Sequence, residues 1–245
     1  MMILYQYPGG DGLTSISPPC LKVEMALRRI GEPYRTVNCT SRSQTLKVSV
    51  TGRLPVLETD GQRIPDSIDI LDALEQRFPQ SDLWPRDPSA HLRDRLWDHF
   101  ANDYLYFIGF YLRWVPTENR QRTAAALVGR APFYVRWVFR GLFLPTFAKR
   151  AYVVGIGGKS LQGVLASFDR GMAMAAAGLE GGAFLQGRDR PGRGDLACAS
   201  LMAQAGYQGT MPDVEARLRA HPKLLDHMRR VFEACSMEPP RWLVT

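Results

Sequence analysis

Cysteine and histidine are scarce in this sequence. Its 245 residues include four cysteines, at positions 20, 39, 198 and 235, and four histidines, at positions 91, 99, 221 and 227. A disulfide scaffold or a zinc knuckle needs several closely spaced ligands, so this scatter excludes both classes. The histidines stand on predicted polar faces or before a proline, and the pair at 91 and 99 lacks a third ligand. We therefore expect no metal site.

Membrane-spanning runs and leader sequences are missing as well. The candidate stretch, residues 131–148, contains Arg136, Arg140 and two prolines, whereas a spanning helix needs about 20 apolar residues without such charges. The first residues, MMILYQYPGGDG, have neither a charged segment nor a small-residue cleavage site, so we expect no secretory signal. A cytoplasmic protein with reduced cysteines is the resulting expectation.

Acidic residues are absent from the middle of the chain. Residues 120–160 hold no Asp or Glu, whereas the other 204 residues carry 23 cations and 24 anions, so the whole excess behind the net charge of +7 lies in this segment. A near-neutral remainder argues against a nucleic-acid partner, which would need a broad basic face. The cations of this basic aromatic segment are Arg120, Arg122, Arg130, Arg136, Arg140, Lys149, Arg150 and Lys159, and its aromatic residues are Phe133, Tyr134, Trp137, Phe139, Phe143, Phe147 and Tyr152.

Three interpretations of the basic aromatic segment remain open. Its arginines can be solvated or stacked on aromatic rings of a core or dimer-contact helix. The segment can instead form a wall of a substrate pocket. Aromatic residues with arginine on a helix also suit an anionic membrane surface, although this is not the favoured interpretation.

The first 80 residues alternate between strand and helix patterns. Ser17 precedes Pro18, the usual pairing of an N-cap with the first helical position, and Asp60-Gly61 is a strong hairpin signal. The predicted elements are a strand at 3–7, a helix ended by Gly31, a strand at 34–38, an ambiguous polar stretch at 41–50, a hairpin with strands at 55–58 and 62–64, and a helix that Asp66 or Ser67 caps.

The order of these elements predicts the fold class. A βαβ unit followed by a ββα unit gives a thioredoxin-like half sheet of four strands, whereas the pattern after the proline-rich residues 79–88 is helical throughout. We therefore expect an α/β region followed by an all-α region. The predicted division is a thioredoxin-like domain at 1–79, a linker at 80–88 and an all-helical domain at 89–245.

Three short stretches of the first region can carry chemistry. Ser17 begins a helix whose unpaired N–H groups favour a thiolate or another anion; the alternative is a plain N-cap. A cis bond at Leu54-Pro55 would turn the Leu54 backbone outward for an extended peptide ligand; the alternative is an ordinary trans proline opening an edge strand. Asp66-Ser67 can hold a carboxylate and an ammonium, or serve only as a cap.

The order and spacing of these stretches resemble the glutathione transferase superfamily. The residues that carry the resemblance are SPPCLKVE at 17–24, GRLPVL at 52–57 and IPDSIDILDAL at 64–74. In the helical region, GIGGKS at 155–160 and FLQGRDRP at 184–191, followed by Asp195, look like the metaxin and failed-axon-connections branch.

This resemblance implies a glutathione-binding enzyme. Ser17, with Ser15 as the alternative, would hold the glutathione thiolate, and Leu54 beside cis-Pro55 would pair with the cysteinyl backbone. Asp66 and Ser67 would bind the γ-glutamyl end, and Arg53 would reach the glycyl carboxylate. The resemblance also implies a homodimer, and a hydrophobic co-substrate in the helical domain, for which we expect a pocket formed by Tyr104, Phe107, Trp114, Phe133 and Trp137.

Two further residues are interpreted as structural. Cys20 stands where a thioredoxin carries its second cysteine, but Ser17 cannot form a disulfide with it, so we expect Cys20 to face the core. Asp195 resembles a buried capping aspartate of the superfamily, although Gly192 replaces the usual Ser or Thr partner.

Three functions follow for the whole chain. The leading one is a transferase that conjugates or transforms a hydrophobic electrophile through a serine-stabilised glutathione thiolate. The first alternative is a non-catalytic binding or scaffold protein, metaxin-like and in one version membrane-associated. The second alternative is a glutathione-dependent isomerase, since isomerisation needs only a thiolate and a positioned electrophile.

Overall fold

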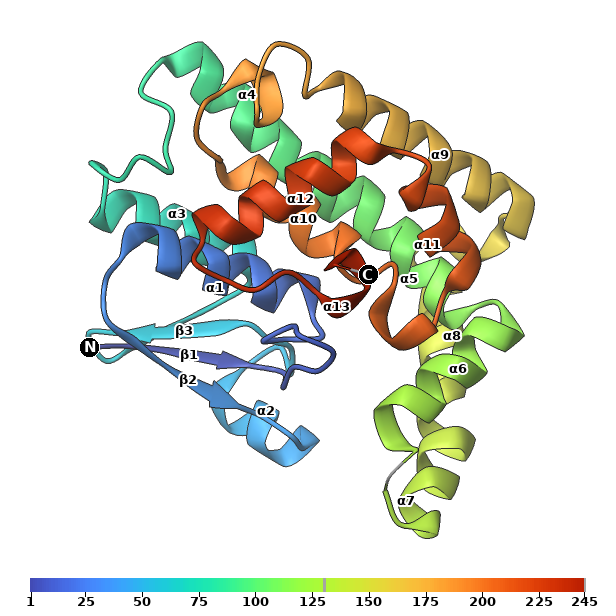
Figure 1. Cartoon of the computed structure of the whole chain (residues 1–245). Helices are drawn as coiled ribbons and strands as arrows, with labels where there is room; N and C mark the ends of the chain where they lie inside the picture. Colours follow the sequence, from blue (N-terminus) through green and yellow to red (C-terminus); the bar gives the residue numbers. More distant parts are fainter. Residues whose placement is uncertain (130, 245) are drawn as a thin grey trace.

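A four-stranded sheet forms the N-terminal part of the computed structural model, which describes residues 1–129 and 131–244 and only the backbone of Phe143. The strands, β1 (Met2–Gln6), β2 (Tyr34–Asn38), β3 (Val56–Thr59) and β4 (Gln62–Pro65), lie in the order β2-β1-β3-β4 (Figure 1). β1 runs parallel to β2, and β3 is antiparallel to both β1 and β4. This is the predicted thioredoxin-like sheet.

Local sequence explains the three helices that accompany the sheet, α1 (Pro18–Ile30), α2 (Arg42–Val48) and α3 (Ser67–Arg77). Ser17 is the N-cap of α1, and Gly31 ends that helix with a positive φ of 82°. The stretch at 41–50 is helical because the Ser41 side chain and Gln44 form a capping box. Both central residues of the β3–β4 turn, Asp60 and Gly61, have positive φ, as a two-residue hairpin requires.

Helices make up the remainder of the chain. Two π-helical segments, Phe100–Leu105 and Phe139–Phe143, interrupt the predicted helical pattern, the second of them just before Pro145. The helices are α4 (Pro88–His99), α5 (Tyr106–Trp114), α6 (Thr117–Val128), α7 (Phe133–Val138), α8 (Leu144–Val153), α9 (Leu161–Ala177), α10 (Arg193–Met202), α11 (Pro212–Arg219), α12 (Pro222–Ala234) and α13 (Arg241–Val244).

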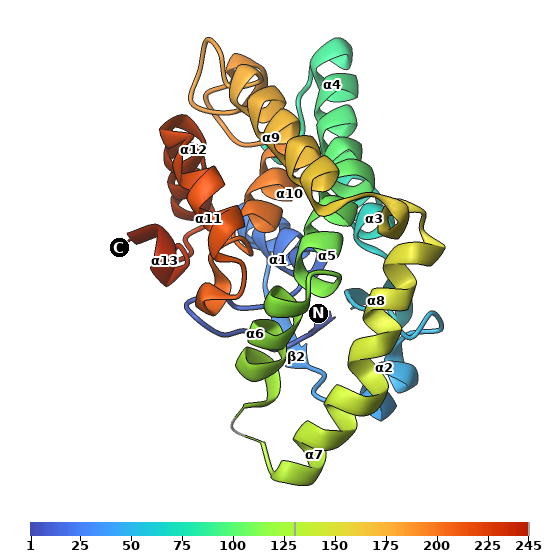
Figure 2. The ribbon, with the colours of Figure 1, turned by 90° about the vertical axis from the view of Figure 1, so that its right-hand side faces the viewer.

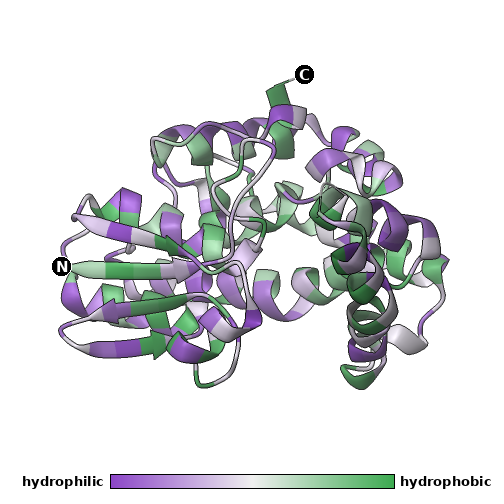
Figure 3. Ribbon diagram, turned by 90° about the horizontal axis from the view of Figure 1, so that it is seen from below, coloured by the Kyte–Doolittle hydropathy of each residue, from purple (hydrophilic) through white to green (hydrophobic). Residues whose placement is uncertain are grey.

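One apolar core extends from the sheet into the helices. It includes Leu4 and Leu21 of the sheet region together with Leu196 of α10 and Phe232 of α12. α10 is central, because it packs against α1, α4 and α12 and nine of its ten residues are buried. Seen from below, the strand that begins at the N-terminus is hydrophobic over most of its length, as expected for a central strand (Figure 3).

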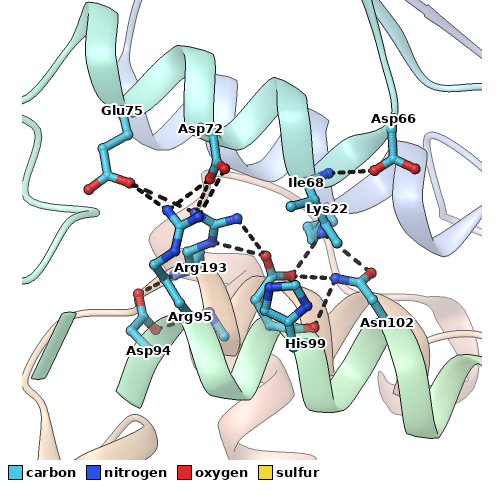
Figure 4. Close-up of polar contacts among 12 residues, drawn as sticks. Lys22, Asp66, Ile68, Asp72, Glu75, Asp94, Arg95, His99, Asn102 and Arg193 are labelled. Atoms are coloured by element: carbon cyan, nitrogen blue, oxygen red, sulfur yellow. Dashed lines mark hydrogen bonds and ion pairs between the residues drawn. The ribbon is translucent and has the colours of Figure 1, made fainter. Parts of the chain in front are cut away.

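A buried network of charges joins the sheet helices to the helical region (Figure 4). Asp98 of α4 accepts a hydrogen bond from Lys22 of α1 at 2.8 Å and forms an ion pair of 2.8 Å with Arg193 of α10. Arg193 also pairs with Asp72 of α3 at 2.7 Å. Lys22, Asp98 and Arg193 are each at most 1% exposed. These charges therefore join α1, α3, α4 and α10. Salt screens the buried members of the network much less than it screens a surface pair.

The basic aromatic segment forms a helical extension. α6 and α8 run side by side, and α7 joins them at the tip farthest from the rest of the helices (Figures 1 and 2). Phe133 and Trp137 of α7 are 78% and 76% exposed. Arg130, which belongs to the same segment, lies outside the described residues.

Candidate functional site

A mainly apolar cavity of about 400 Å³ lies between the sheet region and the helical region. The start of α1 and the loop before β3 form one side, and α5, α6, α8, α9 and α10 supply most of the other. Its charged lining residues are Arg53, Arg113 and Arg150, with no Asp or Glu among the lining residues that the structure describes. A concave apolar site with a few polar groups is the usual form of a small-molecule site.

The two candidate serines occupy different environments. Ser17 lines the cavity, and its side chain makes no capping hydrogen bond to α1. Ser15 is fully buried, donates a hydrogen bond to the Tyr7 carbonyl at 2.7 Å and accepts one from the Ser17 amide at 3.3 Å. Ser15 therefore supports the loop, and Ser17 presents its hydroxyl at the cavity.

Cys20 lies directly behind these serines and is fully buried. Burial raises the pKa of the Cys20 thiol to about 11, although hydrogen bonds from Ser17, the Tyr7 backbone and Ser15 lower it. The thiol consequently stays protonated at neutral pH and faces the core, as the sequence predicts.

Tyr7 is a cavity residue that the sequence interpretation missed. It follows β1 directly, and its ring lines the cavity together with Ser17. Burial, followed by the charge of Cys20, raises the pKa of the Tyr7 hydroxyl. The hydroxyl therefore keeps its proton and can donate a hydrogen bond. An aromatic residue with a hydroxyl at the carboxyl end of β1, opposite a helix N-terminus, was the available signal.

The loop before β3 contains the predicted cis bond, Leu54-Pro55. Leu54 is buried and lines the cavity. The antiparallel register begins at Val56, which pairs with Pro65, so the Leu54 amide and carbonyl stand outside the ladder. Arg53 also lines the cavity with an exposed side chain, while its amide is held by the Ser49 hydroxyl at 3.2 Å.

Asp66 and Ser67 lie at the N-terminus of α3. The Asp66 carboxylate accepts a hydrogen bond from the Ile68 amide at 2.8 Å, and its backbone has an unusual positive φ of 75°. Neither residue lines the cavity itself. Val56 and Pro65 are the last pair of the β3–β4 ladder, so Leu54-Pro55 and Asp66-Ser67 adjoin the same end of it in sequence. Strained backbone of this kind is concentrated at functional sites.

Only one of the five aromatic residues expected in the co-substrate pocket lines the cavity. Trp114 does so and stacks on Phe147 with ring centroids 4.3 Å apart. Tyr104 instead donates its hydroxyl to the Ser167 carbonyl at 3.0 Å. Phe107 makes an edge-to-face contact with Tyr106. Phe133 and Trp137, the remaining two, are on the exposed helix α7.

The helical period explains which side of α5 faces the cavity. Tyr106, Phe110 and Arg113 line it together with Trp114, and their spacing of three and four residues places them on one face. Position 107 is about 100° away around the same helix. Arg150 of α8 closes this side, because its guanidinium lies 5.5 Å from the centre of the Phe110 ring. This spacing within 106–114 was the signal for the missed residues.

Asp195 is buried and holds the chain around α10. Its carboxylate accepts hydrogen bonds from the Gly192 and Leu185 amides, both at 2.8 Å, and lies 2.7 Å from His227 Nε2. The placement of His227 on a polar face was wrong, because the side chain is 1% exposed and pairs with Asp195. Only one of the two hydrogen bonds of a capping box is therefore present, as expected. The Asp195 carboxylate accepts from the Gly192 amide, but Gly192 has no side chain that could accept the reciprocal bond.

Membrane-spanning helices and clusters of metal ligands are both lacking among the described residues. None of the helices in the described ranges is both long enough and apolar enough to cross a membrane. No group of three or more potential metal ligands occurs within residues 1–129 and 131–244.

Known proteins resemble this chain in both sequence and fold. The family model described as glutathione S-transferase, N-terminal domain, matches residues 14–82. Failed axon connections of Drosophila melanogaster is 37% identical over 78 residues, which are 32% of this chain and 18% of that protein. A probable maleylacetoacetate isomerase of Caenorhabditis elegans is 31% identical over 78 residues, 30% of this chain and 36% of the relative. The chain thus spans well under half the length of these curated relatives.

Solved structures extend the likeness to the whole fold. A glutathione transferase from Phanerochaete chrysosporium has a TM-score of 0.65 at 20% identity and covers 96% of each chain. A delta-class glutathione transferase from Nilaparvata lugens has the same TM-score at 19% identity, over 98% of this chain and 90% of that one. The cis-Pro loop and the start of α1 at Ser17 line one cavity. The similar proteins therefore point in the same direction as the sequence motifs. Residues 14–82 thus match the glutathione S-transferase N-terminal domain family, and the whole chain has the fold of solved glutathione transferases.

Proposed function

We propose that the protein is a glutathione-dependent transferase that acts on a hydrophobic electrophilic small molecule. One observation carries the proposal: a single cavity brings Ser17, at the N-terminus of α1, and Leu54, beside cis-Pro55, opposite an apolar wall of the helical region. The first wall suits a peptide-like thiol, and the second suits an apolar co-substrate.

Glutathione would lie along the loop before β3. The Leu54 amide and carbonyl, which stand outside the ladder, would pair with the cysteinyl backbone in the manner of an added strand. Asp66 and Ser67 at the N-terminus of α3 would bind the γ-glutamyl end, and the exposed Arg53 would bind the glycyl carboxylate. Support for this orientation comes from the β3–β4 ladder, whose last pair, Val56 and Pro65, directly adjoins both groups of residues in the chain.

Ser17 would stabilise the glutathione thiolate by donating its hydroxyl hydrogen to sulfur. The N-terminus of α1 adds a partial positive charge, so the pKa of the bound thiol falls and its proton leaves to solvent. The thiolate then forms a bond to the electrophilic carbon, and the leaving group departs with the electron pair of the broken bond. Tyr7, whose protonated hydroxyl also lines the cavity, is a second hydrogen-bond donor within reach of this space.

Calorimetric titration and conjugation assays test this proposal. The wild-type protein should bind glutathione at millimolar or lower concentration. A titration that shows no binding in this range would overturn the proposal. Ser17→Ala should lower kcat/KM by about 10- to 100-fold because one thiolate hydrogen bond is lost. Glutathione affinity should change by no more than a few fold. Ser43→Ala, at an exposed position of α2, is the matched control, and Tyr7→Phe measures the contribution of the second hydroxyl.

A glutathione-dependent isomerase is the second candidate, favoured by the likeness to the probable maleylacetoacetate isomerase. In that reaction the thiolate adds to an electrophilic double bond and later leaves again, so glutathione is regenerated. Measuring free thiol during turnover separates the two reactions, since conjugation consumes one thiol for each product molecule. The third candidate, a non-catalytic binding protein, is favoured by the likeness to Failed axon connections, and it predicts no turnover at all.

A further inference from the structure

The apolar cavity contains a half-buried cation, Arg113, that forms an ion pair with no Asp or Glu of the described residues. Arg113 projects from α5 into the cavity, and its Nη2 donates a hydrogen bond to the Gln204 carbonyl at 2.9 Å. Burial lowers the pKa of its guanidinium to about 10, with the Tyr207 and Tyr106 hydroxyls as the groups that oppose this. Arg113 therefore stays charged at neutral pH in surroundings that solvate it poorly.

A second polar group beside Arg113 also lacks partners. Gln204 lines the cavity with a side chain that is 4% exposed, and neither its Nε2 nor its Oε1 has a hydrogen-bond partner in the described chain. Thr123 of α6 lines the same cavity, is 1% exposed and has a similarly unpartnered hydroxyl. Buried polar groups are nearly always paired, so several together in one cavity indicate a polar ligand group.

The sign of the charge selects the ligand. Every charged side chain lining the cavity in the described ranges is an arginine, so an anion gains favourable interactions there and a cation does not. Arginine presents a planar fork of donors that matches a carboxylate. The Gln204 amide and the Thr123 hydroxyl can donate hydrogen bonds to the same group.

We propose that the co-substrate is a hydrophobic organic acid whose carboxylate is bound by Arg113 and the Gln204 side-chain amide. Its apolar body packs between Phe110 and Trp114 of α5 and Met172 of α9, all of which line the cavity. This inference rests on the proposed function, because it names the substrate class of the same cavity. The carboxylate acts only as an anchor and takes no part in bond making.

The position of Arg113 along α5 sets the length of the ligand. Tyr106 lies close enough to Tyr7 and to Arg113 to influence the pKa of both. Two helical turns separate Tyr106 from Arg113, or roughly 10 Å along the axis. The electrophilic atom, which must meet the thiol near Tyr7 and Ser17, is thus several bonds from the carboxylate.

Arg113 is distinct from the group expected to bind glutathione. Arg53 adjoins the cis-Pro loop, whereas Arg113 is held by Gln204 after the end of α10. Loss of Arg113 should therefore leave glutathione binding intact, and a large loss of glutathione affinity in an Arg113 variant would overturn this assignment.

Calorimetry without glutathione provides the test, so that it does not depend on catalysis. The probes are 4-phenylbutyrate, its methyl ester and 4-phenylbutylamine at pH 7. Wild-type protein should bind the acid about 10- to 100-fold more tightly than the ester, as expected for hydrogen bonds to a charged group. The amine should bind most weakly.

Two variants and a control complete the experiment. Arg113→Met should remove the preference for the acid and change ester affinity less than about threefold. Gln204→Leu, which keeps Arg113, should reduce the preference by about 3- to 10-fold. Arg136→Met, on the exposed α7, removes the same charge outside the cavity and should leave the preference intact.

The results separate this inference from the proposed function. Equal affinity of wild-type protein for acid and ester, or a preference that survives Arg113→Met, overturns the inference whatever glutathione does. If Arg113→Met does not fold, an unchanged preference in Gln204→Leu overturns it instead. Failure of glutathione to bind, with the acid preference intact, would overturn the proposed function and leave an acid-binding site.

Discussion

At the scale of single residues, the buried charges are positions where loss of one partner should be costly. Lys22, Asp98 and Arg193 come from three helices and have almost no exposed surface. Such a network is strongly destabilised when one member is removed, because the remaining charges are left buried without compensation. Two aspartates of α4, at positions 94 and 98, therefore have measurable roles outside the cavity.

Asp98→Asn should lower the free energy of unfolding by about 3–5 kcal/mol, since Lys22 and Arg193 lose their shared carboxylate. Urea denaturation followed by circular dichroism measures the change. Asp103→Asn is the matched control: its carboxylate is 68% exposed, and its pair with His99 is a surface pair. The control should change stability by less than about 0.5 kcal/mol. Equal effects of the two substitutions would contradict a buried network.

Asp94 gives the fold a pH dependence of its own. Burial and the charge of Asp195 raise its pKa to about 7, despite hydrogen bonds from the Gly194 and Arg193 amides. The folded chain then binds this proton more tightly than the unfolded chain, whose aspartate titrates near its ordinary value of about 4. Stability contributed by this group is full below about pH 4 and is lost as the pH rises towards 7.

Melting temperatures between pH 4.5 and 7.5 measure this effect. Asp94→Asn should flatten the decline in melting temperature with rising pH, because the titrating group is gone. The lowered pKa values of Asp72 and Asp98 act on stability below about pH 4, outside this window. Asp226→Asn, in an exposed pair with Arg229, is the control. An identical slope in Asp94→Asn and wild-type protein would show that another group causes the decline.

At the scale of elements, α5 supplies several of the residues that line the cavity. Its face at 106–114 combines aromatic residues, Arg113 and one glycine, Gly109. A Cβ atom built on Gly109 meets nothing within 4 Å. The absent side chain therefore leaves space in the cavity, rather than allowing close packing of two backbones.

Substitutions at Gly109 should have opposite effects on stability and substrate binding. Gly109→Ala should raise the free energy of unfolding by up to about 1 kcal/mol, as expected inside a helix. Gly109→Leu should fill the cavity and raise KM for a hydrophobic co-substrate without weakening glutathione binding. Gly171→Ala is the contrast, because its Cβ would lie 2.6 Å from Leu105 Cδ2 and should destabilise the fold. Destabilisation by Gly109→Ala would contradict the open space.

Trp137 of the helical extension and Trp114 of α5 should respond differently to substitution. Trp137 is 76% exposed on α7, so Trp137→Ala should leave melting temperature and activity unchanged. Trp114 is 8% exposed and stacks on Phe147 in the cavity wall, so Trp114→Ala should cost about 3–5 kcal/mol and reduce activity. Thermal denaturation and conjugation assays measure both. A loss of activity in Trp137→Ala would restore the original expectation that this residue lines the pocket.

At the scale of the whole molecule, the sheet region and the helical region share one apolar core. Even the proline-rich connection between them is packed, with Leu83 and Trp84 at 0% and 5% exposure. The Trp84 indole N–H donates to the Phe78 carbonyl at 3.0 Å. Residues 80–88 therefore mark the change from the mixed strand and helix pattern to the helical pattern. The stretch itself contains buried side chains.

A shared core should make unfolding cooperative. Far-ultraviolet circular dichroism and tryptophan fluorescence should give coincident denaturation curves, because neither region can lose its core contacts alone. A fragment of residues 1–79 should be markedly less stable than the full chain, since α1 would expose the face that packs on α10. Two resolved transitions, or a stable fragment, would show that the regions fold independently.

The sequence by itself determined the order of elements and much of the cavity side formed by the sheet region. Local signals were sufficient there, since Pro18, Gly31 and the Asp60-Gly61 turn act through backbone geometry that neighbouring residues set. These signals led to the thioredoxin-like sheet, whereas the cis bond at Leu54-Pro55 was expected from the family resemblance.

Only the tertiary structure decided the co-substrate wall. Its residues come from α5, α6, α8, α9, α10 and α11 among others, and a break such as the π-helical segment at Phe100–Leu105 changes which face of α5 turns inward. Composition marked the basic aromatic segment but not its division into an exposed tip at Trp137 and a cavity side at Phe147. The role proposed for Arg113 depends on the lack of a carboxylate partner among the described residues, which is a property of packing and not of local sequence.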